Sequence, residues 1–309
     1  MENPVRVMAV LKDKKSDDLI IRYTHLISRL FKPKQVYFVL HSLKHDLPGE
    51  ILNRYPVLAE PEGEPAHDRL KQVVDNRFKP PRHCQVLFST MKGGGVMELL
   101  RFSLKKKIDL ILIGKADKKE NEPQDLLAEK IVRKAPCPVL LIPAGSRPVM
   151  ENILVPVDFS DNSRLAVESA LRFAAAAKIE QIFCLHVYHV PMSFSRTGKS
   201  YEEFSGIMED IARLSYDRFF DRFDTGKIDV TPVLERGTDA AESIRSSSKA
   251  LAVDLVVIGN KGRHAALLLG SVSERLVRIT DRPLLVAKRK GIWIHLIKTL
   301  LSWKFKPVK

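Results

Sequence analysis

The sequence has few cysteines and no long apolar run. Its three cysteines, Cys84, Cys137 and Cys184, are odd in number and form no CxxC pair. This argues against a disulfide framework and a cysteine zinc site, so we expect reduced, mostly buried thiols. No apolar stretch approaches the roughly 18 residues that span a bilayer, and the N-terminus shows neither an h-region nor a cleavage site. These absences favour a cytoplasmic protein.

Acidic residues are also scarce relative to basic ones. The chain has 51 Lys and Arg against 37 Asp and Glu, which gives a formal net charge of +14. Such an excess attracts nucleic acid, anionic lipid or phosphorylated ligands without choosing among them. Nucleic acid is the least favoured partner, because no basic–aromatic motif of a known reader is present.

Familiar catalytic motifs are missing as well. The sequence contains no Gly-x-Ser-x-Gly elbow, no HExxH and no Gly-x-Gly-x-x-Gly. His186 and His189 lie three apart on a strand and its exit, so their side chains point to opposite faces and a metal pair is not expected. We therefore predict no catalytic and no metal-ligating residues, and we leave open a weak ATP hydrolysis.

An internal repeat organises the 309 residues. Residues 108–114 match residues 253–259 at an offset of 145, and Leu40-His41, Glu129 and Pro138 find counterparts at the same offset. The chain therefore reads as a tandem duplication joined by the Pro/Gly/Ser-containing linker 143–148. The predicted domains are 1–145 and 150–288, followed by a tail at 289–309.

Each repeat alternates apolar strands with helices. In the second repeat, strands are expected at 152–157, 181–187, 229–234, 254–258 and 283–287, with helices at 163–177, 204–223, 239–250 and from Arg275 onward. In the helix at 204–223, Ile207, Ile211, Leu214 and Phe219-Phe220 alternate with charges, which indicates an amphipathic helix. The predicted fold class is α/β, with two tandem doubly wound, Rossmann-like parallel-sheet domains and a C-terminal basic amphipathic helix.

The stretch from Asp254 to Ala287 carries the strongest functional signal. A buried strand ends in Gly259, Gly262 follows, and the turn Gly270-Ser271 opens a helix. Backbone N–H groups and the positive end of a helix in this arrangement favour a phosphate. The alternative is that the glycines serve only as turns. Because ligands sit at the carboxyl ends of parallel strands, Asp158 and Gly259 would border one cleft, which favours a nucleotide site.

Three stretches of the second repeat together resemble one family. Residues 153–160, the triplet Leu185-His186-Val187, and Gly259-x-x-Gly262 with Gly270-Ser271-Val272-Ser273-Glu274 are similar to the universal stress protein family, in its UspA-like tandem-domain form. The resemblance implies an adenine nucleotide alpha hydrolase-like fold and ATP as ligand, with Mg²⁺ held through the phosphates. It spans nearly the whole chain and is stronger for the second half.

The resemblance also implies a role for each matching residue. The base and ribose would contact Pro156, Val157, Asp158 and Val187. The sugar and phosphates would lie against Gly259, Gly262, Gly270, Ser271, Val272 and Ser273. Seven residues separate Gly262 from Gly270 where the nucleotide-binding members have nine, which bears most on the triphosphate end.

The first repeat departs from this pattern. Asp117, Asp125 and Leu126 stand where the second repeat has Gly262, Gly270 and Ser271. Two carboxylates repel a phosphate and leucine offers no hydroxyl, so we expect this half to bind no nucleotide. The run Gly93-Gly94-Gly95 precedes a helix on another connection and indicates a turn.

Two hypotheses of different class follow. The first is an adenine-nucleotide-binding regulatory protein of the stress response, with one site, in the second domain. The second is a scaffold or interaction protein that binds no nucleotide. For either, the family implies that the repeats dock as an intramolecular pseudo-dimer through residues 139–142 and 284–287; a homo-oligomer is left open.

The tail lies beyond the family resemblance. It has no acidic residue from Lys288 onward, and its apolar residues at helical spacing are Trp293, Leu296, Ile297, Leu300 and Leu301. Two readings remain: the apolar face packs on this protein or on a second chain, or the tail attaches peripherally to the anionic inner membrane face.

Overall fold

The computed structural model describes residues 6–12, 17–42, 54, 66–92, 95–115, 125–260 and 269–288 of the chain. It divides into two compact units, with the boundary between Pro148 and Val149. Each unit is described by itself. Gly262, Asp13, Asp117 and the basic tail at 289–309 lie outside the described residues.

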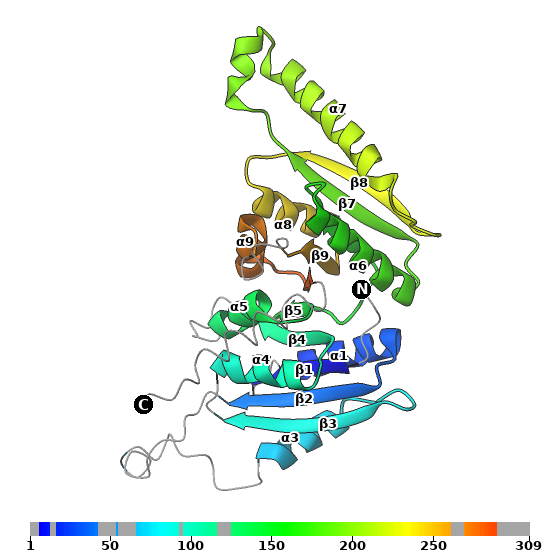
Figure 1. Ribbon diagram of the computed structural model, residues 1–309, viewed down its shortest axis with the longest axis vertical. Coiled ribbons are helices and arrows are strands. Elements are labelled where there is room, and N and C mark those ends of the chain that lie inside the picture. Colours follow the sequence, from blue (N-terminus) through cyan, green and yellow to red (C-terminus); the bar gives the residue numbers. More distant parts are fainter. Residues whose placement is uncertain are drawn as a thin grey trace, which may run out of the picture. The chain divides into compact units, whose positions relative to one another are not determined.

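The first unit is a parallel sheet with helices between its strands (Figure 1). Its elements are β1 (Arg6–Leu11), α1 (Asp17–Phe31), β2 (Gln35–Ser42), α3 (Ala66–Asp75), β3 (Gln85–Lys92), α4 (Gly95–Lys105), β4 (Leu110–Lys115), α5 (Asp125–Lys134) and β5 (Val139–Pro143). The strands follow the order β3-β2-β1-β4-β5. All four pairings are parallel, with Val10 aligned to Val39 on β2 and to Ile113 on β4.

The second unit repeats this arrangement. Its elements are β6 (Ile153–Pro156), α6 (Asp161–Ala177), β7 (Gln181–Tyr188), the 3₁₀ turn η2 (Met192–Thr197), α7 (Tyr201–Phe220), β8 (Asp229–Arg236), α8 (Ala240–Ala250), β9 (Leu255–Gly259), α9 (Ser271–Ile279) and β10 (Leu284–Ala287). The strand order β10-β9-β6-β7-β8 is the same topology, and every pairing is parallel. The α/β fold class predicted from the sequence is confirmed.

The order of the strands reverses direction at one point in each unit. In the second unit this switch lies between β6 and β9, where Leu154 pairs with Val256. Helices α6 and α7 cover one face of this sheet and α8 and α9 the other, as right-handed crossovers require (Figure 1). A crevice for a ligand is therefore expected at the carboxyl ends of β6 and β9.

The strands are near-continuously apolar because both faces of each sheet are covered. Leu255, Val257 and Ile258 of β9 are all at most 4% exposed, as are Leu284 to Ala287 of β10. Each of the buried Leu, Val and Ile side chains stabilises the fold by about 1.5–3 kcal/mol. The carboxyl ends of these strands are consequently held in fixed positions.

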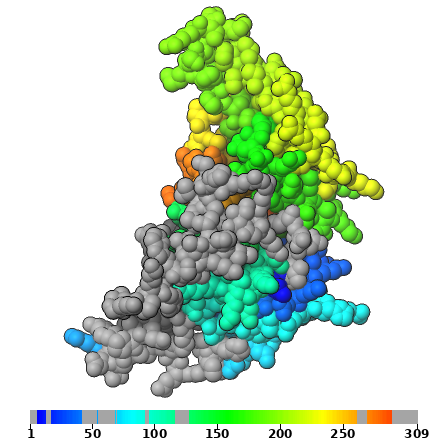
Figure 2. Space-filling view, viewed as in Figure 1, coloured from blue at the N-terminus to red at the C-terminus, as the bar shows by residue number. Residues whose placement is uncertain are grey.

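Helix α7 is present where an amphipathic helix was predicted, but three of its aliphatic residues face outward. Ile207, Ile211 and Leu214 are exposed, whereas the buried residues are Ser205, Ala212 and Tyr216. Small side chains bring the helix close to the sheet, and the Tyr216 hydroxyl donates a hydrogen bond to the carbonyl of Val230 at 2.7 Å. Periodicity thus identified the helix and not the side that packs. The helix forms part of the molecular surface, as the space-filling view shows (Figure 2).

The structure also bears on the predictions about the cysteines and about membrane-spanning segments. Cys137 and Cys184 are buried free thiols, and Cys84 is half-buried and also free. Burial raises the pKa of the Cys184 thiol, which keeps it protonated. Within the described residues, no helix is both long enough and apolar enough to span a bilayer.

Candidate functional site

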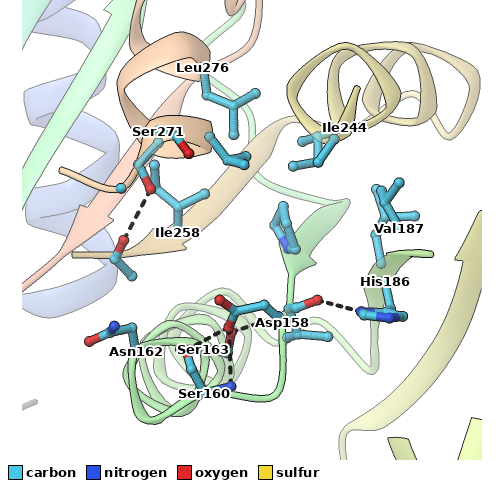
Figure 3. A pocket seen from close by; sticks show the side chains of 18 residues that line it. Asp158, Ser160, Asn162, Ser163, His186, Val187, Ile244, Ile258, Ser271 and Leu276 are labelled. Carbon is cyan, nitrogen blue, oxygen red and sulfur yellow. Dashed lines mark hydrogen bonds between the residues drawn. The ribbon is translucent and has the colours of Figure 1, made fainter. Parts of the chain in front are cut away.

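A cavity of about 380 Å³ opens at the carboxyl end of the second unit's sheet (Figure 3). Strands β6, β7 and β9 contribute their ends, and α6, α8 and α9 contribute their first turns. Its lining residues are Pro156, Val157, Asp158, Ser160, Asn162, Ser163, Leu185, His186, Val187, Ala240, Ile244, Ile258, Gly259, Gly270, Ser271, Val272, Ser273 and Leu276. The cavity lies at the strand-order switch between β6 and β9.

The predicted site residues come together here. Each of those that the structure describes lines the cavity, although they derive from four separate segments: Pro156, Val157, Asp158, Val187, Gly259, Gly270, Ser271, Val272 and Ser273. Gly262 is the exception, because it lies outside the described residues.

Asp158 follows β6 and anchors the start of α6. Its Oδ1 accepts hydrogen bonds from the Ser160 and Ser163 hydroxyls, both at 2.5 Å, and from the Ser160 N–H at 3.1 Å. Burial alone would raise the pKa of Asp158, but these hydrogen bonds outweigh it and hold the pKa below its usual range. Asp158 is therefore a fixed carboxylate at neutral pH. Among the described residues Oδ2 accepts no hydrogen bond, so it remains available to a ligand hydroxyl.

His186 joins the ends of β7 and β6. Its Nδ1 lies 2.9 Å from the carbonyl oxygen of Val157, and since a carbonyl only accepts, Nδ1 carries the proton. The Phe159 ring stacks against the imidazole with centroids 4.4 Å apart, and Phe159 reaches this place through a left-handed backbone with φ 61°. The sequence indicated His186 only as a core or rim residue. Its position between two strand ends arises from pairing that sequence spacing does not display.

Gly259 is needed because the chain comes very close to it. A Cβ at this position would lie 2.2 Å from the backbone oxygen of Asn162, at the start of α6. The Gly259 carbonyl oxygen accepts a hydrogen bond from the Ser273 hydroxyl at 3.4 Å. Gly259 thus allows α6 and α9 to approach the end of β9 and narrow the cavity there.

Three helices begin at the cavity and differ in how their first N–H groups are satisfied. The Ser160 side chain caps α6, accepting from the Ser163 N–H, and the Asp239 side chain caps α8, accepting from the Glu242 N–H. Helix α9 has Gly270 as its N-cap and makes no side-chain cap hydrogen bond. The positive end of this helix, whose first N–H groups donate to no capping side chain of the described residues, therefore borders the cavity.

Apolar side chains form another part of the wall. Val187 and Ile244 lie near one another on one side, and Ile258 and Leu276 on the other, as Figure 3 shows. Ile244 and Ala240 belong to α8, which the sequence did not associate with the site. The sequence predicted a helix at 239–250 but not which elements it would contact. An apolar wall of this kind suits a planar ring.

The described lining of the cavity suits the binding of a ligand. Among the residues that the structure describes, no lysine or arginine lines it. In the described part of the chain, no group of three or more His, Cys, Asp or Glu is placed to hold a metal ion. An apolar wall, a fixed carboxylate and an uncapped helix end together fit a ligand with a ring, hydroxyls and a negatively charged end.

The second unit also matches a family model. Residues 150–288 match the model of the universal stress protein family. The second unit is therefore a universal stress protein domain. The family predicted from the sequence is confirmed.

Individual relatives place this match in context. The universal stress protein MJ0577 of Methanocaldococcus jannaschii is 24% identical over 46% of this chain and 96% of its own. The universal stress protein Rv2623 of Mycobacterium tuberculosis is 26% identical over 51% of this chain, and the match spans only about half, 53%, of that protein. The crystal structure of PA1789 from Pseudomonas aeruginosa covers 97% of this chain at 15% identity with a TM-score of 0.63, which shows similarity of fold alone.

Proposed function

We propose that the second unit binds an adenine nucleotide, with ATP as the first candidate, and that the protein acts as a nucleotide-responsive regulator in the cytoplasmic stress response. The observation that carries the proposal is the uncapped N-terminus of α9 in the same cavity as Asp158. A phosphate satisfies the N–H groups that no side chain of this helix satisfies. The ribose hydroxyls are then within reach of the Asp158 carboxylate.

The remaining walls support the same orientation of the ligand. The base would lie against Val187 and Ile244, with Pro156 and Val157 bordering the base and ribose. Ligand pockets typically measure about 300–1,000 Å³, so a cavity near the lower end suits a single nucleotide. Gly259 and Gly262 would let the chain approach the sugar and phosphates.

The length of the bound phosphate chain depends on residues 261–268. Seven residues separate Gly262 from Gly270, and Mg²⁺ would be held through the ligand's own phosphates. Among the described lining residues, backbone N–H groups at the start of α9 and the hydroxyls of Ser271 and Ser273 would hold the phosphates. We therefore assign the site to binding, and place any hydrolysis of ATP as a slow side reaction.

Titration calorimetry of the full chain with ATP and Mg²⁺ tests this proposal, and Gly270 offers a sharp variant. Among the described residues, a Cβ at Gly270 would meet only Ser273 Oγ, at 4.0 Å, which leaves room for a side chain. Aspartate and asparagine are both good N-caps, and Gly270→Asp and Gly270→Asn should each preserve or slightly raise thermal stability. Only Gly270→Asp adds a negative charge beside the phosphates. We expect one site per chain, at least 10-fold weaker binding in Gly270→Asp, and a smaller loss in Gly270→Asn.

The alternative function is a scaffold that binds no nucleotide. Its support is the basic tail, which would bring the protein to an anionic membrane surface or pack on protein. Absence of heat on titration, together with no nucleotide in the protein as purified, would favour this alternative. Equal ATP binding by the two Gly270 variants would show that the phosphates do not lie at the start of α9.

A further inference from the structure

Helix α7 carries an apolar row that nothing in its own unit covers. Ile207, Ile211 and Leu214 are 36%, 49% and 56% exposed, and their spacing of four and three residues places them on one face. The opposite face, with Ala212 and Tyr216, packs on the sheet. A row of three large aliphatic side chains at the centre of a 20-residue surface helix is a contiguous patch of the kind that marks an interaction site.

The two halves of the same helix differ in charge. The half Tyr201–Asp210 holds four acidic residues and no basic one: Glu202, Glu203, Glu209 and Asp210. The half Ile211–Phe220 holds Arg213 and Arg218 against a single acidic residue, Asp217. Some of these are engaged within the chain, since Glu202 pairs with Arg236 at 3.0 Å and Glu209 with Arg213 at 3.3 Å. Glu203 accepts from the Ser200 N–H at 2.8 Å in the capping box, and it is fully at the surface.

We propose that α7 is a self-docking surface, on which two copies of this chain pair α7 against α7 in antiparallel orientation. The midpoint of the apolar row lies between Asp210 and Ile211, so a two-fold axis at that point gives the greatest apolar overlap. Ile207 then faces Leu214 of the second copy, and Ile211 lies beside Ile211 of the second copy. The charges agree with this choice, because Glu203 comes opposite Arg218 twice.

A parallel arrangement of the two helices is disfavoured by their charges. It would place the acidic half of one copy against the acidic half of the other, with like charges side by side. Anionic lipid is also disfavoured as the occupant, because four acidic residues flank the N-terminal half of the patch. A second copy supplies an apolar face, and it brings Arg218 to the N-terminal half of α7, which has no basic residue.

Sedimentation analysis of the full chain measures the pairing. We expect reversible dimers, and Ile211→Lys should weaken dimerisation at least 10-fold. The matched control is Val73→Lys, which alters a similarly exposed aliphatic residue, 39% exposed, on α3 of the first unit; it should change the dimerisation constant less than two-fold. Asp210→Asn should strengthen dimerisation, because the Asp210 carboxylates of the two copies lie close together near the two-fold axis and repel each other. Unchanged circular dichroism would show that each variant is folded.

Cysteine cross-linking tests the orientation. In the proposed register two Ile211→Cys side chains are separated by about 1.5 Å along the helix axis, whereas two Leu214→Cys side chains are about 10 Å apart. Disulfides need Cα atoms within about 7 Å, so Ile211→Cys should form a cross-linked dimer and Leu214→Cys should not. The wild type, with its half-buried Cys84, gives the background. Monomers at all concentrations, an Ile211→Lys variant that dimerises normally, or equal cross-linking at both positions would each overturn the proposal.

Discussion

The carboxyl edges of the two sheets share a strand order and differ in what fills them. In the second unit, Val157 and Gly259 border the cavity at the ends of β6 and β9. In the first unit Lys12 stands at the position of Val157, 145 residues earlier. Its ammonium group donates to the carbonyl of Gly114, the counterpart of Gly259, at 3.2 Å. In the first unit, a lysine side chain therefore links the end of β1 to the end of β4.

Two further differences separate these edges. Both carboxylate oxygens of Asp17, at the start of α1, accept a hydrogen bond from the Lys12 N–H, at 3.0 and 3.1 Å. These bonds fix the position of Lys12, the residue that follows β1. The helix α5 begins at Asp125, where α9 is preceded by the uncapped Gly270. The same topology thus carries different residues at the ends of matching strands in the two units. Fold alone does not decide function, and a few residues at strand ends do.

The largest effect is expected from adding one methyl group at the matched glycines. In Gly259→Ala the new Cβ would meet the Asn162 backbone oxygen at 2.2 Å, so α6 must shift. In Gly114→Ala it would meet the end of the Ile20 side chain at 3.2 Å, which can give way. We expect Gly259→Ala to lower the free energy of unfolding by about 1–3 kcal/mol and Gly114→Ala by well under about 1 kcal/mol.

Urea unfolding of both variants, followed with and without ATP, measures this difference. Nucleotide binding should be lost in Gly259→Ala and unchanged in Gly114→Ala. Equal destabilisation would contradict the close approach of α6 to the end of β9.

The next effect concerns the Asp158 carboxylate. Its depressed pKa means that its stabilising contribution is complete above the ordinary carboxyl value of about 3.9 and is lost as pH falls through the folded-state pKa. Asp158→Asn should lower the unfolding free energy of the second unit by about 1 kcal/mol at pH 7, a value reduced by the residue's partial exposure to solvent. Unfolding at a series of pH values checks this, because the gap between variant and wild type should close at low pH. A gap independent of pH would show that the charge is not involved.

A smaller effect is expected at His41, the first unit's counterpart of His186. His41 is 1% exposed, and within the described residues neither ring nitrogen has a hydrogen-bond partner. Burial lowers the pKa of His41, although the Gly95 backbone and Glu98 act in the opposite direction. The folded state therefore holds the ring neutral, and stability falls as pH drops below about 6.5, where the unfolded chain takes up a proton.

His41→Leu should raise the unfolding free energy of the first unit by up to about 1 kcal/mol and flatten its dependence on pH between about 7.5 and 5.5. His186→Leu is the control, because it removes the hydrogen bond to Val157 and should destabilise the second unit. A His41→Leu variant less stable than the wild type at both pH values would show that the imidazole makes a favourable interaction.

Much of the site was predictable because strand ends and helix starts have local signatures. Asp158 directly follows a buried strand, and Gly270-Ser271 opens an apolar-periodic helix, so both were placed from the sequence. Their convergence followed from the rule for parallel sheets. The strands of the second unit were located to within a few residues for the same reason, since continuous apolar runs between helices have few alternatives.

What was missed depends on packing across the sheet. The contribution of Ile244 follows from how α8 lies over β7, and the role of His186 follows from the register of β7 with β6. The inward face of α7 was not evident, because Ser205 and Ala212 pack closely there while aliphatic residues face outward. Hydrophobic periodicity assumes that the apolar face is the buried one. A helix with a second partner breaks that assumption.

The central claim is that nucleotide binds in one half of the chain, at the carboxyl edge of the second sheet. Photolabelling with 8-azido-ATP, followed by peptide mapping, tests it most directly because the label reports which residues lie next to the base. We predict labelled peptides from the segments around Val157, Val187 and Ile244, protection by excess ATP, and no protected label between residues 6 and 142. A protected label in the first unit, or equal labelling of both, would contradict the account.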